Sequence, residues 1–290
     1  MCEIATMMTK KKVGIQGVKG CFHDVAAHRW MSDDSLETVS FDSFEDMFAA
    51  LAKDPEMMAA VAIENTIAGA LLQNFEYIRK SERTVIGECK LRVSHSLCAL
   101  PGSKIADLHE VRSHYMALLQ CKDYLSHYPN LKKVEDFDTA GCARMIAENQ
   151  MKGCAAIAPA YAAEIYGLEV LAEGIEDDNR NFTRFLIIGP KDAPSPEDAD
   201  KISVAFTVPH EKGALSKVLT ILTFYDINLS MLQSMPVVGH EWEYRFYADL
   251  TFDDKERCQQ AITAVAPLTS DFRILGAYKM HNAQCTMHNH

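Results

Sequence analysis

The segment FTRFLIIGPKDAPSPEDADKISVAFTVP, residues 182–209, indicates how the chain is organised. Its two apolar runs, at 182–189 and 201–209, have the length and composition of buried strands. Between them, residues 191–201 are rich in Pro, Asp and Ala and show no apolar period, which is typical of a linker. The segment therefore predicts that one domain ends, and a second and smaller one begins, within it.

Upstream of the linker, short apolar runs alternate with helix-like segments. We expect strands at 12–17, 57–65, 133–137, 152–159 and 182–189, and one or two strands at 88–100. Helices are expected at 22–30, 69–81, 114–128, 139–150 and 160–167. Strands that alternate with helices are typical of parallel pairing. The first domain is therefore predicted to have an α/β fold.

Downstream of the linker the pattern is compact. We expect strands at 201–209, 227–237, 242–252 and 272–278, and helices at 213–226 and 255–269. The order βαββαβ is that of the ferredoxin-like plan. A domain of this size and plan is more often a sensor or a dimerisation module than a catalyst.

The composition excludes several classes of protein. The chain has 290 residues, of which 48% are hydrophobic and 24% are charged, as in globular proteins. The net charge of −11 argues against a nucleic-acid binder. No apolar run reaches the length of about eighteen residues that a membrane helix needs. Without a signal-like start or a Cys-x-x-Cys pair, the nine cysteines favour reduced thiols and a cytoplasmic location.

Polar side chains recur where predicted strands end. In α/β sheets such positions collect ligands, and the helix starts that follow offer free N–H groups to anions. The residues concerned are Glu64, Asn65, Ser94, His95, Ser113, His114, Thr139, Thr183 and Arg184. Asn65 and Thr139 are equally well explained as helix caps, and each Ser-His pair as structural, since adjacent strand residues face opposite sides.

Several longer segments bring a known family to mind. They are GVKGCFHDVAA, AIENTIAGAL, VSHSL, VRSHYMALLQC, FDTAGCA and the run that ends in FTRF, and after the linker EKGALSKVL and INLSMLQSMP. From about Val13 to Tyr278 the chain resembles the prephenate dehydratases, whose signature is Thr-Arg-Phe. The later segments are similar to an ACT domain.

The resemblance implies a fold and domain bounds. The expected fold is a two-lobed α/β catalytic domain like type II periplasmic binding proteins, followed by a ferredoxin-like ACT regulatory domain. The expected parts are an N-terminal tail at 1–12, the catalytic domain at 13–190, the linker at 191–201, the ACT domain at 202–280 and a C-terminal tail at 281–290.

The resemblance also implies an activity, the decarboxylating dehydration of prephenate to phenylpyruvate in phenylalanine biosynthesis, without metal or cofactor. Thr183 is expected to be essential, helping the ring hydroxyl to leave, and Glu64 or a histidine to supply the proton. Arg184 either clamps a carboxylate or orders the pocket from behind, and Phe185 either packs against the ring or fills the core. Asn65, Ser94, His95, Ser113, His114 and Thr139 complete the expected substrate site.

Regulation is expected from the second domain. The resemblance implies that L-phenylalanine binds there as an effector and that the domain assembles the chain into a homodimer or homotetramer. The expected effector-binding residues are Gly213, Ala214, Leu215, Asn228 and Ser234. The family's Glu-Ser-Arg-Pro reads QSMP here, so Gln233 and Met235 replace both charges. This paired change indicates a remodelled regulatory segment.

Other departures and readings stay open. The opening motif has Val18, Cys21 and His23 where the family has Pro, Thr and Ser, and Pro159 replaces a common Ser. Arogenate is an alternative substrate, and a non-catalytic amino-acid sensor is an alternative function. A cysteine- or metal-dependent enzyme is a third reading, suggested by the tail residues His281, Cys285, His288 and His290.

Overall fold

The structure, a computed structural model, describes residues 10–31, 36–237, 239 and 242–280. The chain divides into two compact units. The first comprises Met1–Gly69 and Lys90–Phe185, and the second comprises Ala70–Cys89 and Leu186–His290. The domain bounds expected from the sequence remain a prediction.

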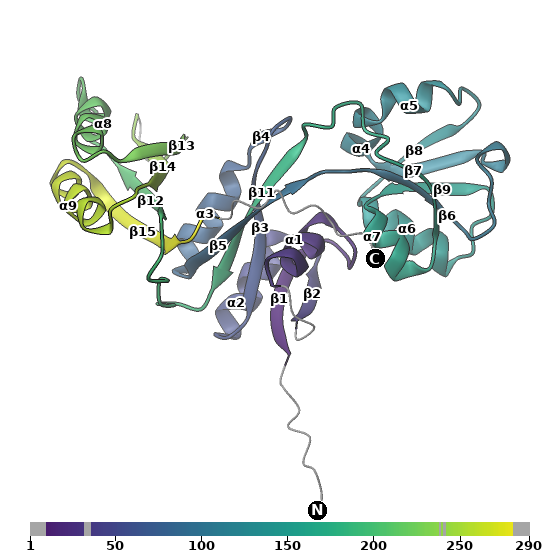
Figure 1. The fold of residues 1–290 in the computed structure, drawn as a ribbon, viewed down its shortest axis with the longest axis horizontal. Helices are drawn as coiled ribbons and strands as arrows, with labels where there is room; N and C mark the ends of the chain where they lie inside the picture. The colour runs from purple at the N-terminus through teal and green to yellow at the C-terminus, as the bar shows by residue number, and fades with distance from the viewer. Residues whose placement is uncertain (1–9, 32–35, 238, 240–241, 281–290) are drawn as a thin grey trace, which may run out of the picture. The chain divides into compact units, whose positions relative to one another are not determined.

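One sheet has the strand order β2-β1-β3-β11-β5, with β4 paired to β3 (Figure 1). Its strands are β1 (Lys11–Gln16), β2 (Leu36–Phe41), β3 (Met58–Asn65), β4 (Gly69–Ala70), β5 (Thr84–Arg92) and β11 (Phe182–Gly189). Strand β1 pairs in parallel with both β2 and β3. Residues 58–63 of β3 are all buried, as expected for an inner strand with both faces covered. Strands β5 and β11 each run from one unit into the other.

Helices α1 (Phe22–Trp30) and α2 (Phe44–Lys53) contact β1. Helix α2 begins where the side chain of Ser43 accepts a hydrogen bond from the backbone N–H of Asp46, an N-cap that satisfies one of the free amides. Strand β2 and helix α2 were not among the predicted elements. The predicted helix at 69–81 is α3 (Leu72–Ser81), which belongs to the second unit.

The first unit also contains a five-stranded sheet of order β10-β6-β9-β7-β8. Its strands are β6 (Ser96–Ala99), β7 (Glu110–His114), β8 (Lys132–Asp136), β9 (Cys154–Ala158) and β10 (Glu169–Glu173). Strand β7 pairs in parallel with β8 and β9, whereas β6 pairs antiparallel with β9 and β10. The expectation of parallel pairing is therefore wrong for part of this sheet.

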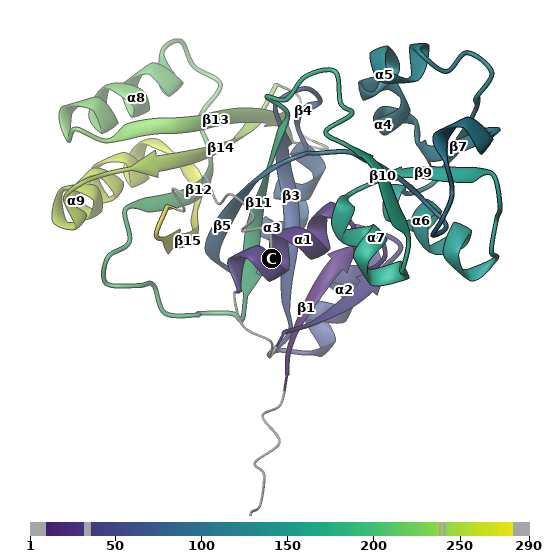
Figure 2. The same cartoon turned by 45° about the vertical axis from the view of Figure 1, so that its right-hand side comes forward.

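Helices cover both faces of this sheet (Figures 1 and 2). Helices α4 (Tyr115–Gln120) and α5 (Lys122–Ser126) lie on one face, and α6 (Thr139–Glu148) and α7 (Ala160–Tyr166) lie on the other. The single helix predicted at 114–128 is interrupted at Cys121. A 3-10 turn, η1 (Ile105–Asp107), precedes β7.

A four-stranded antiparallel sheet of order β13-β14-β12-β15 forms most of the second unit. Its elements are β12 (Lys201–Thr207), α8 (Ala214–Phe224), β13 (Asn228–Pro236), β14 (Tyr244–Thr251), α9 (Lys255–Val265), η2 (Ala266–Leu268) and β15 (Ser270–Tyr278). The predicted ferredoxin-like order βαββαβ is confirmed.

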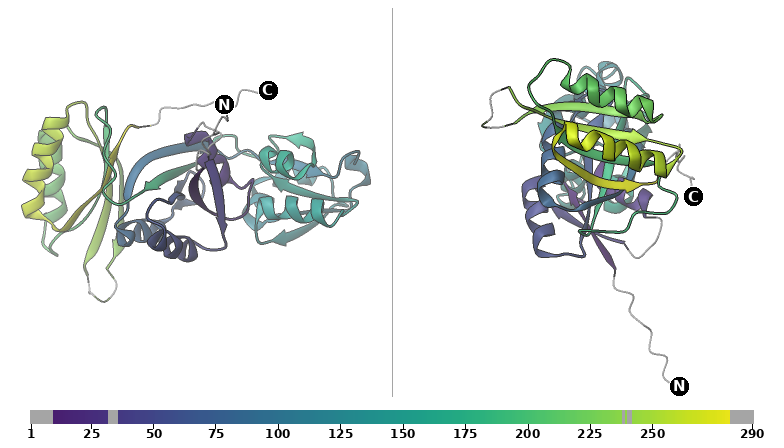
Figure 3. Two further views of the ribbon diagram at one scale, coloured as in Figure 1. Left: turned by 90° about the horizontal axis from the view of Figure 1, so that it is seen from below. Right: turned by 90° about the vertical axis from the view of Figure 1, so that its left-hand side faces the viewer.

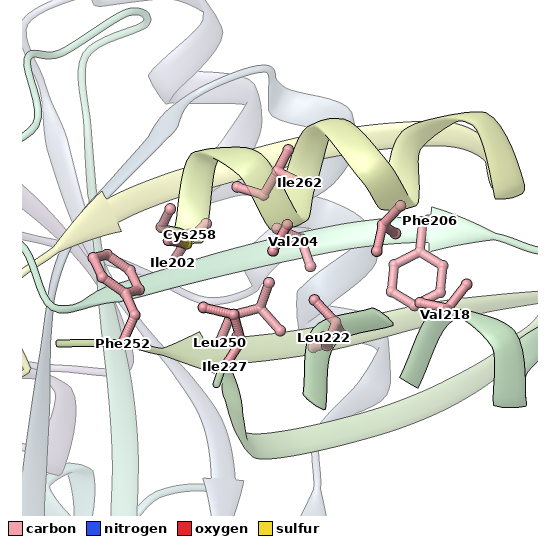
Figure 4. Close-up of a cluster of buried hydrophobic side chains, with 13 residues drawn as sticks. Ile202, Val204, Phe206, Val218, Leu222, Ile227, Leu250, Phe252, Cys258 and Ile262 are labelled. Atoms are coloured by element: carbon pink, nitrogen blue, oxygen red, sulfur yellow. The ribbon is translucent and has the colours of Figure 1, made fainter. Parts of the chain in front are cut away.

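Both helices of this domain lie on one face of the sheet (Figure 3). Buried side chains of β12 and β14 meet those of α8 and α9 between the two layers, and Phe206, Val218, Leu222 and Ile262 lie in this cluster (Figure 4). Burial of such side chains contributes roughly 1.5–3 kcal/mol each. Across the part of the chain that the structure describes, no helix is long and apolar enough to span a membrane.

Candidate active site

Asn65, the last residue of β3, makes a tight local turn with its own side chain. Its Oδ1 accepts hydrogen bonds from the backbone N–H groups of Ile67 at 2.9 Å and Ala68 at 2.8 Å. A side-chain oxygen that accepts from the next residues is the reason why Asn favours turns. Because Oδ1 is committed to these two donors, the amide group Nδ2 must serve as the donor on the other side.

The amide group of Asn65 meets Thr183. Asn65 Nδ2 lies 2.9 Å from Thr183 Oγ1, 2.7 Å from Asn181 Oδ1 and 3.3 Å from the carbonyl oxygen of Phe182. Thr183 Oγ1 therefore acts as an acceptor in this contact. Among the described residues no acceptor is seen for the hydroxyl hydrogen of Thr183, so this hydrogen is available to a substrate. The geometry thus orients a single hydroxyl as a donor.

The network continues through Asn181 to Gln120 and His95. Asn181 Nδ2 donates to Gln120 Oε1 at 3.1 Å, and His95 Nε2 lies 3.1 Å from the same oxygen. A carbonyl oxygen can only accept, so Nε2 carries the hydrogen of the neutral ring. Nδ1 of His95 is buried and meets no hydrogen-bond partner among the described residues. Burial lowers the pKa of His95, although Gln120 and Glu176 act against this.

His95 is held from behind by a charged pair. Its backbone N–H donates to Glu176 Oε2 at 2.9 Å, and Arg92 Nη2 lies 2.8 Å from Oε1 of the same carboxylate. The ring of Phe22 packs edge-on to the imidazole, with 5.6 Å between ring centroids. These contacts fix both the backbone and the ring of His95.

Backbone pairing holds the loop after β3 against the start of β11. Thr66 N–H donates to the Phe182 carbonyl at 2.9 Å, and Phe182 N–H donates to Thr66 Oγ1 at 2.9 Å. Thr66 Oγ1 also donates to the carbonyl oxygen of Arg180 at 3.1 Å. These bonds are the local reason why Asn65 and Thr183 meet.

The glycine turn after β1, which contains Gly17 and Gly20, lies next to Asp138 and Ala162. Gly20 has a positive φ of 86°, and a Cβ there would come within 2.8 Å of Ala162 Cα, so only glycine fits. Asp138 caps α6 by accepting from Gly141 N–H at 2.9 Å. Burial raises the pKa of Asp138, although backbone N–H groups of Gly141, Val18 and Thr139 lower it. Asp138 therefore joins the glycine turn to the start of α6.

The remaining predicted residues take other positions. Ser113 is fully buried and donates to the carbonyl oxygen of Ile157 at 2.6 Å, while His114 is exposed and caps α4 through Met116 N–H. Thr139 begins α6 as a buried residue, and Glu64 and Ser94 are half-buried.

Two further predicted residues follow Thr183 in β11. Arg184 is half-buried. Phe185 is 1% exposed, and its ring packs edge-on to His23 at 5.1 Å. Burial lowers the pKa of His23 to about 4. The structure thus brings Asn65, His95 and Thr183 into one network, and the roles of all the predicted residues remain predictions.

Two members of the network, Asn181 and Gln120, were not predicted, and neither was Glu176, which holds the backbone of His95 from outside the network. Asn181 is 1% exposed, and it directly precedes the FTRF segment, so its position next to that motif was a usable signal. Gln120 ends a short helix and Glu176 follows β10. Neither has a spacing or a neighbour that distinguishes it from an ordinary surface residue.

The cysteines that the structure describes do not suit nucleophilic catalysis. All seven described cysteines are buried and free. Burial raises the pKa of Cys21, Cys98 and Cys142 to about 12, whereas a reactive cysteine requires the thiolate. Among the residues that the structure describes, no group of three His, Cys, Asp or Glu side chains is placed to hold a metal. The tail residues His281, Cys285, His288 and His290 lie outside the described residues.

A pocket of about 280 Å³ lies at the start of α8. Gly213, Ala214 and Leu215 line it together with Glu211 and the aromatic residues of β14 and its approach. Gly213 has a φ of 78° and stands directly before the helix, whose first N–H groups favour an anion. Asn228 and Ser234, on the edge strand β13, are not among its lining residues, so the structure brings together three of the five predicted residues.

Comparison with known proteins adds three kinds of match. A family model described as prephenate dehydratase matches residues 13–193. An arogenate dehydratase/prephenate dehydratase of Arabidopsis thaliana is 36% identical over an alignment of 288 residues that covers 93% of this chain and 69% of that protein. Arogenate dehydratase 1 of Petunia hybrida is 34% identical over 292 residues, covering 94% of this chain and 68% of that protein.

Solved structures match over nearly the whole chain. A protein described as a novel type of quorum quenching acylase has a TM-score of 0.85 and 28% identity, covering 94% of this chain and 99% of that one. A prephenate dehydratase of Arthrobacter aurescens in complex with L-Phe has a TM-score of 0.79 and 26% identity, covering 92% and 89%. The predicted fold class, a periplasmic-binding-protein-like α/β domain with a ferredoxin-like ACT domain, is confirmed.

Proposed function

The chain belongs to the prephenate dehydratase family, and on this premise we propose that it converts prephenate to phenylpyruvate in L-phenylalanine biosynthesis. The substrate loses its ring carboxylate as carbon dioxide and its ring hydroxyl as water. The electron pair of the broken carbon–carbon bond enters the ring as the carbon–oxygen bond breaks, and the ring becomes aromatic. Because aromaticity supplies the driving force, the protein has to orient the substrate and help the hydroxyl to leave.

One observation carries the proposal: Asn65 donates to Thr183 Oγ1 and so aims the threonine hydrogen elsewhere. A hydroxyl held in this way can donate to the departing oxygen of the substrate. Such assistance to a leaving group contributes about 10²–10⁴-fold to the rate. The Asn181–Gln120–His95 chain keeps Asn65 in place through further neutral hydrogen bonds.

Threonine is too weak an acid to give up its proton without replacement. We propose Glu64, next to Asn65 at the end of β3, as the source. Burial lowers the pKa of His95, which disfavours the protonated form of its ring as the source. The half-buried or buried hydroxyls of Ser94, Ser113 and Thr139 and the imidazole of His114 remain proposed substrate contacts.

The experiment that tests the proposal is turnover of prephenate by Thr183→Ala beside Thr183→Ser. The alanine variant is expected to lose about 10²-fold or more in kcat, and the serine variant, which keeps a hydroxyl, is expected to retain most of the activity. Melting temperatures of both variants should stay close to that of the wild type. Alanine turnover within threefold of the wild type, roughly 0.6 kcal/mol, would show that the hydroxyl does not act in the reaction.

The choice of substrate is the finer part of the proposal. Relatives are named for arogenate, for prephenate or for both. Arogenate carries an amine where prephenate carries a keto group, so kcat/KM for the two compounds with the same preparation decides between them. A higher value for arogenate would move the assignment to arogenate dehydratase. We also propose a cytoplasmic location. This proposal is independent of the substrate, and it differs from the chloroplastic location that the names of several plant relatives give.

The likeness to a quorum quenching acylase favours a second candidate function, hydrolysis of an N-acyl bond. The two functions differ in their products, phenylpyruvate and carbon dioxide in one case and a carboxylic acid and an amine in the other. Both assays on one preparation distinguish them. Acid release from an N-acyl substrate that is lost in Thr183→Ala, without prephenate turnover, would favour the acylase.

For regulation, we propose that L-phenylalanine binds the pocket at the start of α8. Support comes from the pocket-lining Gly213, Ala214 and Leu215 and from the L-Phe complex of the Arthrobacter relative. We further propose assembly as a homodimer or homotetramer through this domain, whose edge strand β13 carries Asn228 and Ser234. Gln233 and Met235 are uncharged where the family motif is charged. We expect this change to weaken the coupling between L-phenylalanine binding and enzyme activity rather than the binding itself.

Calorimetry with L-phenylalanine on Gly213→Ala tests this site. Gly213 and Gly102 have the same φ of 78°, and a Cβ at either meets nothing within 4 Å, so Gly102→Ala imposes a matched backbone strain elsewhere. Only Gly213→Ala is expected to weaken binding, by about tenfold. Equal affinity in both variants, or competition between phenylalanine and prephenate, would place the effector elsewhere.

A further inference from the structure

A second and larger pocket, which the site described above does not use, lies in the second unit between α3 and the strands β13 and β14. Its volume is about 510 Å³, within the range of small-molecule sites. The lining residues are Gln73, Glu76, Tyr77, Arg79, Lys80, Met235, Pro236, Val237 and Arg245.

The charged part of the lining is cationic in sum. Arg245 donates to Glu76 at 2.9 Å and to Asp271 at 3.0 Å, and Arg79 pairs with the same two carboxylates. Lys80 reaches Glu76 at 3.7 Å. Three cations thus face two carboxylates. Glu76 already accepts from both arginines and from Tyr247, and has little capacity left to receive a cationic ligand.

Arg245 keeps one donor without an acceptor. Its side chain is 12% exposed, and Nε is buried with no hydrogen-bond partner in the described part of the chain. A buried donor left unpaired costs about 1–3 kcal/mol. A carboxylate that reaches the guanidinium from the pocket would supply an acceptor and balance the excess charge.

The rest of the lining is mainly apolar, apart from Gln73. Met235, Pro236 and Val237 come from the end of β13, and Tyr77 comes from α3. Met235, Pro236 and Val237 are uncharged, so this wall carries no additional cation. A ligand that fits both parts of the pocket has a negatively charged end and an apolar body.

We propose that this pocket binds a small aromatic carboxylate that carries no ammonium group. An ammonium group would add a positive charge to a lining that already has one in excess, whereas the α8 pocket includes Glu211 and suits an amino acid. The proposal does not depend on the dehydratase assignment, because it rests on the lining of a different pocket. The second unit is thus predicted to bind an aromatic carboxylate without an ammonium group in this pocket and an amino acid in the α8 pocket.

Calorimetry on the full chain with 3-phenylpropanoate tests the proposal, with the neutral 3-phenylpropan-1-ol as the comparison ligand. The carboxylate is expected to bind with a dissociation constant of roughly 1 mM or below, and the alcohol about tenfold more weakly. Gln73 is exposed on α3, so Gln73→Glu places a carboxylate in the lining without disturbing the core. It should weaken binding of 3-phenylpropanoate about tenfold.

Matched variants separate this pocket from general charge effects. Gln260→Glu, at an exposed position of α9, and Lys217→Gln, at an exposed position of α8, should leave binding within about twofold, whereas Lys80→Gln should weaken it about threefold. Melting temperatures identify any variant that fails to fold. Absence of binding at millimolar 3-phenylpropanoate overturns the proposal, as does binding that Gln73→Glu and Lys80→Gln leave unchanged.

Discussion

Two hydrogen-bonded networks in this molecule serve different ends. In the first unit, Asn65, Thr183, Asn181, Gln120 and His95 form a neutral chain of amides, a hydroxyl and an imidazole. In the second unit, Glu76 collects hydrogen bonds from two arginines and a tyrosine, and Asp271 shares the same arginines. The first network contains no formal charge, and the second consists almost entirely of charges.

The contrast follows from what each kind of group can specify. An amide has separate donor and acceptor ends, so the two backbone bonds to Asn65 Oδ1 determine the direction of every bond that follows, up to Thr183. An ion pair instead supplies strength with little directional information beyond the fork of an arginine. We infer that the neutral network orients a hydroxyl and that the charged one holds α3 against the strands of its own unit.

Reversal of the hydrogen bond between Asn65 and Thr183 should have the largest effect on turnover. Asn65→Asp keeps an oxygen for the N–H groups of Ile67 and Ala68 but loses the donor to Thr183. The aspartate would accept the threonine hydrogen, which is then no longer offered to substrate. We expect kcat for prephenate to fall about 10²-fold or more, with the melting temperature changed by only a few degrees.

Asn65→Ala serves as the comparison, because it loses the turn as well as the donor. It should show a similar loss of turnover together with a larger loss of stability, about 1–2 kcal/mol. If Asn65→Asp is active within threefold of wild type, the direction of the hydrogen bond is irrelevant and the contrast between the two networks fails.

The charged network should respond in stability and not in turnover. Burial by itself would raise the pKa of Glu76, but hydrogen bonds from Arg79, Tyr247 and Arg245 outweigh it and lower the pKa to about 2. Glu76→Gln removes the charge that these donors share. We expect the free energy of unfolding to fall by about 2–3 kcal/mol at pH 7, while kcat per folded enzyme stays within about twofold.

The pH dependence supplies the control for this second prediction. The folded pKa of Glu76 lies below its ordinary value of 4.5, so its stabilisation is complete above pH 4.5 and is lost as the pH falls towards 2. Denaturant unfolding at several pH values should show that loss in wild type and a flatter profile in Glu76→Gln. If the free energy of unfolding depends on pH in the same way in the two proteins, Glu76 is not held as the structure indicates.

Much of the fold was predictable from the sequence because its elements carry strong local patterns. The βαββαβ domain has clear apolar periods in α8 and in the strands around it, and its order was predicted correctly. Strand β2 was missed because LETVSF is a short run with few apolar residues. Strand β6 lies within the predicted strand region 88–100, but its antiparallel direction was not predicted, because side chains do not encode strand direction. The break between α4 and α5 at Cys121 was not predicted, because the apolar pattern of residues 114–128 is continuous.

The candidate site was predictable only at motif positions. Asn65 and Thr183 stand beside recognisable segments, and the structure bonds them directly. Gln120 was not predictable, because its role arises from a single shared oxygen between two distant residues, His95 and Asn181. Ser113 shows the opposite case. Its motif is conspicuous, yet its hydroxyl donates to a backbone carbonyl inside the sheet.

The smallest effect is expected at Arg184, which follows Thr183 in β11. Successive side chains of a strand point to opposite faces, so Arg184 and Thr183 point away from each other. If Thr183 faces the substrate, the side chain of Arg184 therefore points away from it. We therefore favour the role of ordering the site from behind over that of a carboxylate clamp. Arg184→Lys retains the charge and loses the planar fork. It should lower the melting temperature by a few degrees, equivalent to about 1 kcal/mol, and leave KM within twofold. A KM for prephenate that rises tenfold at an unchanged melting temperature would restore the clamp, and would place Arg184 with Thr183 at the substrate.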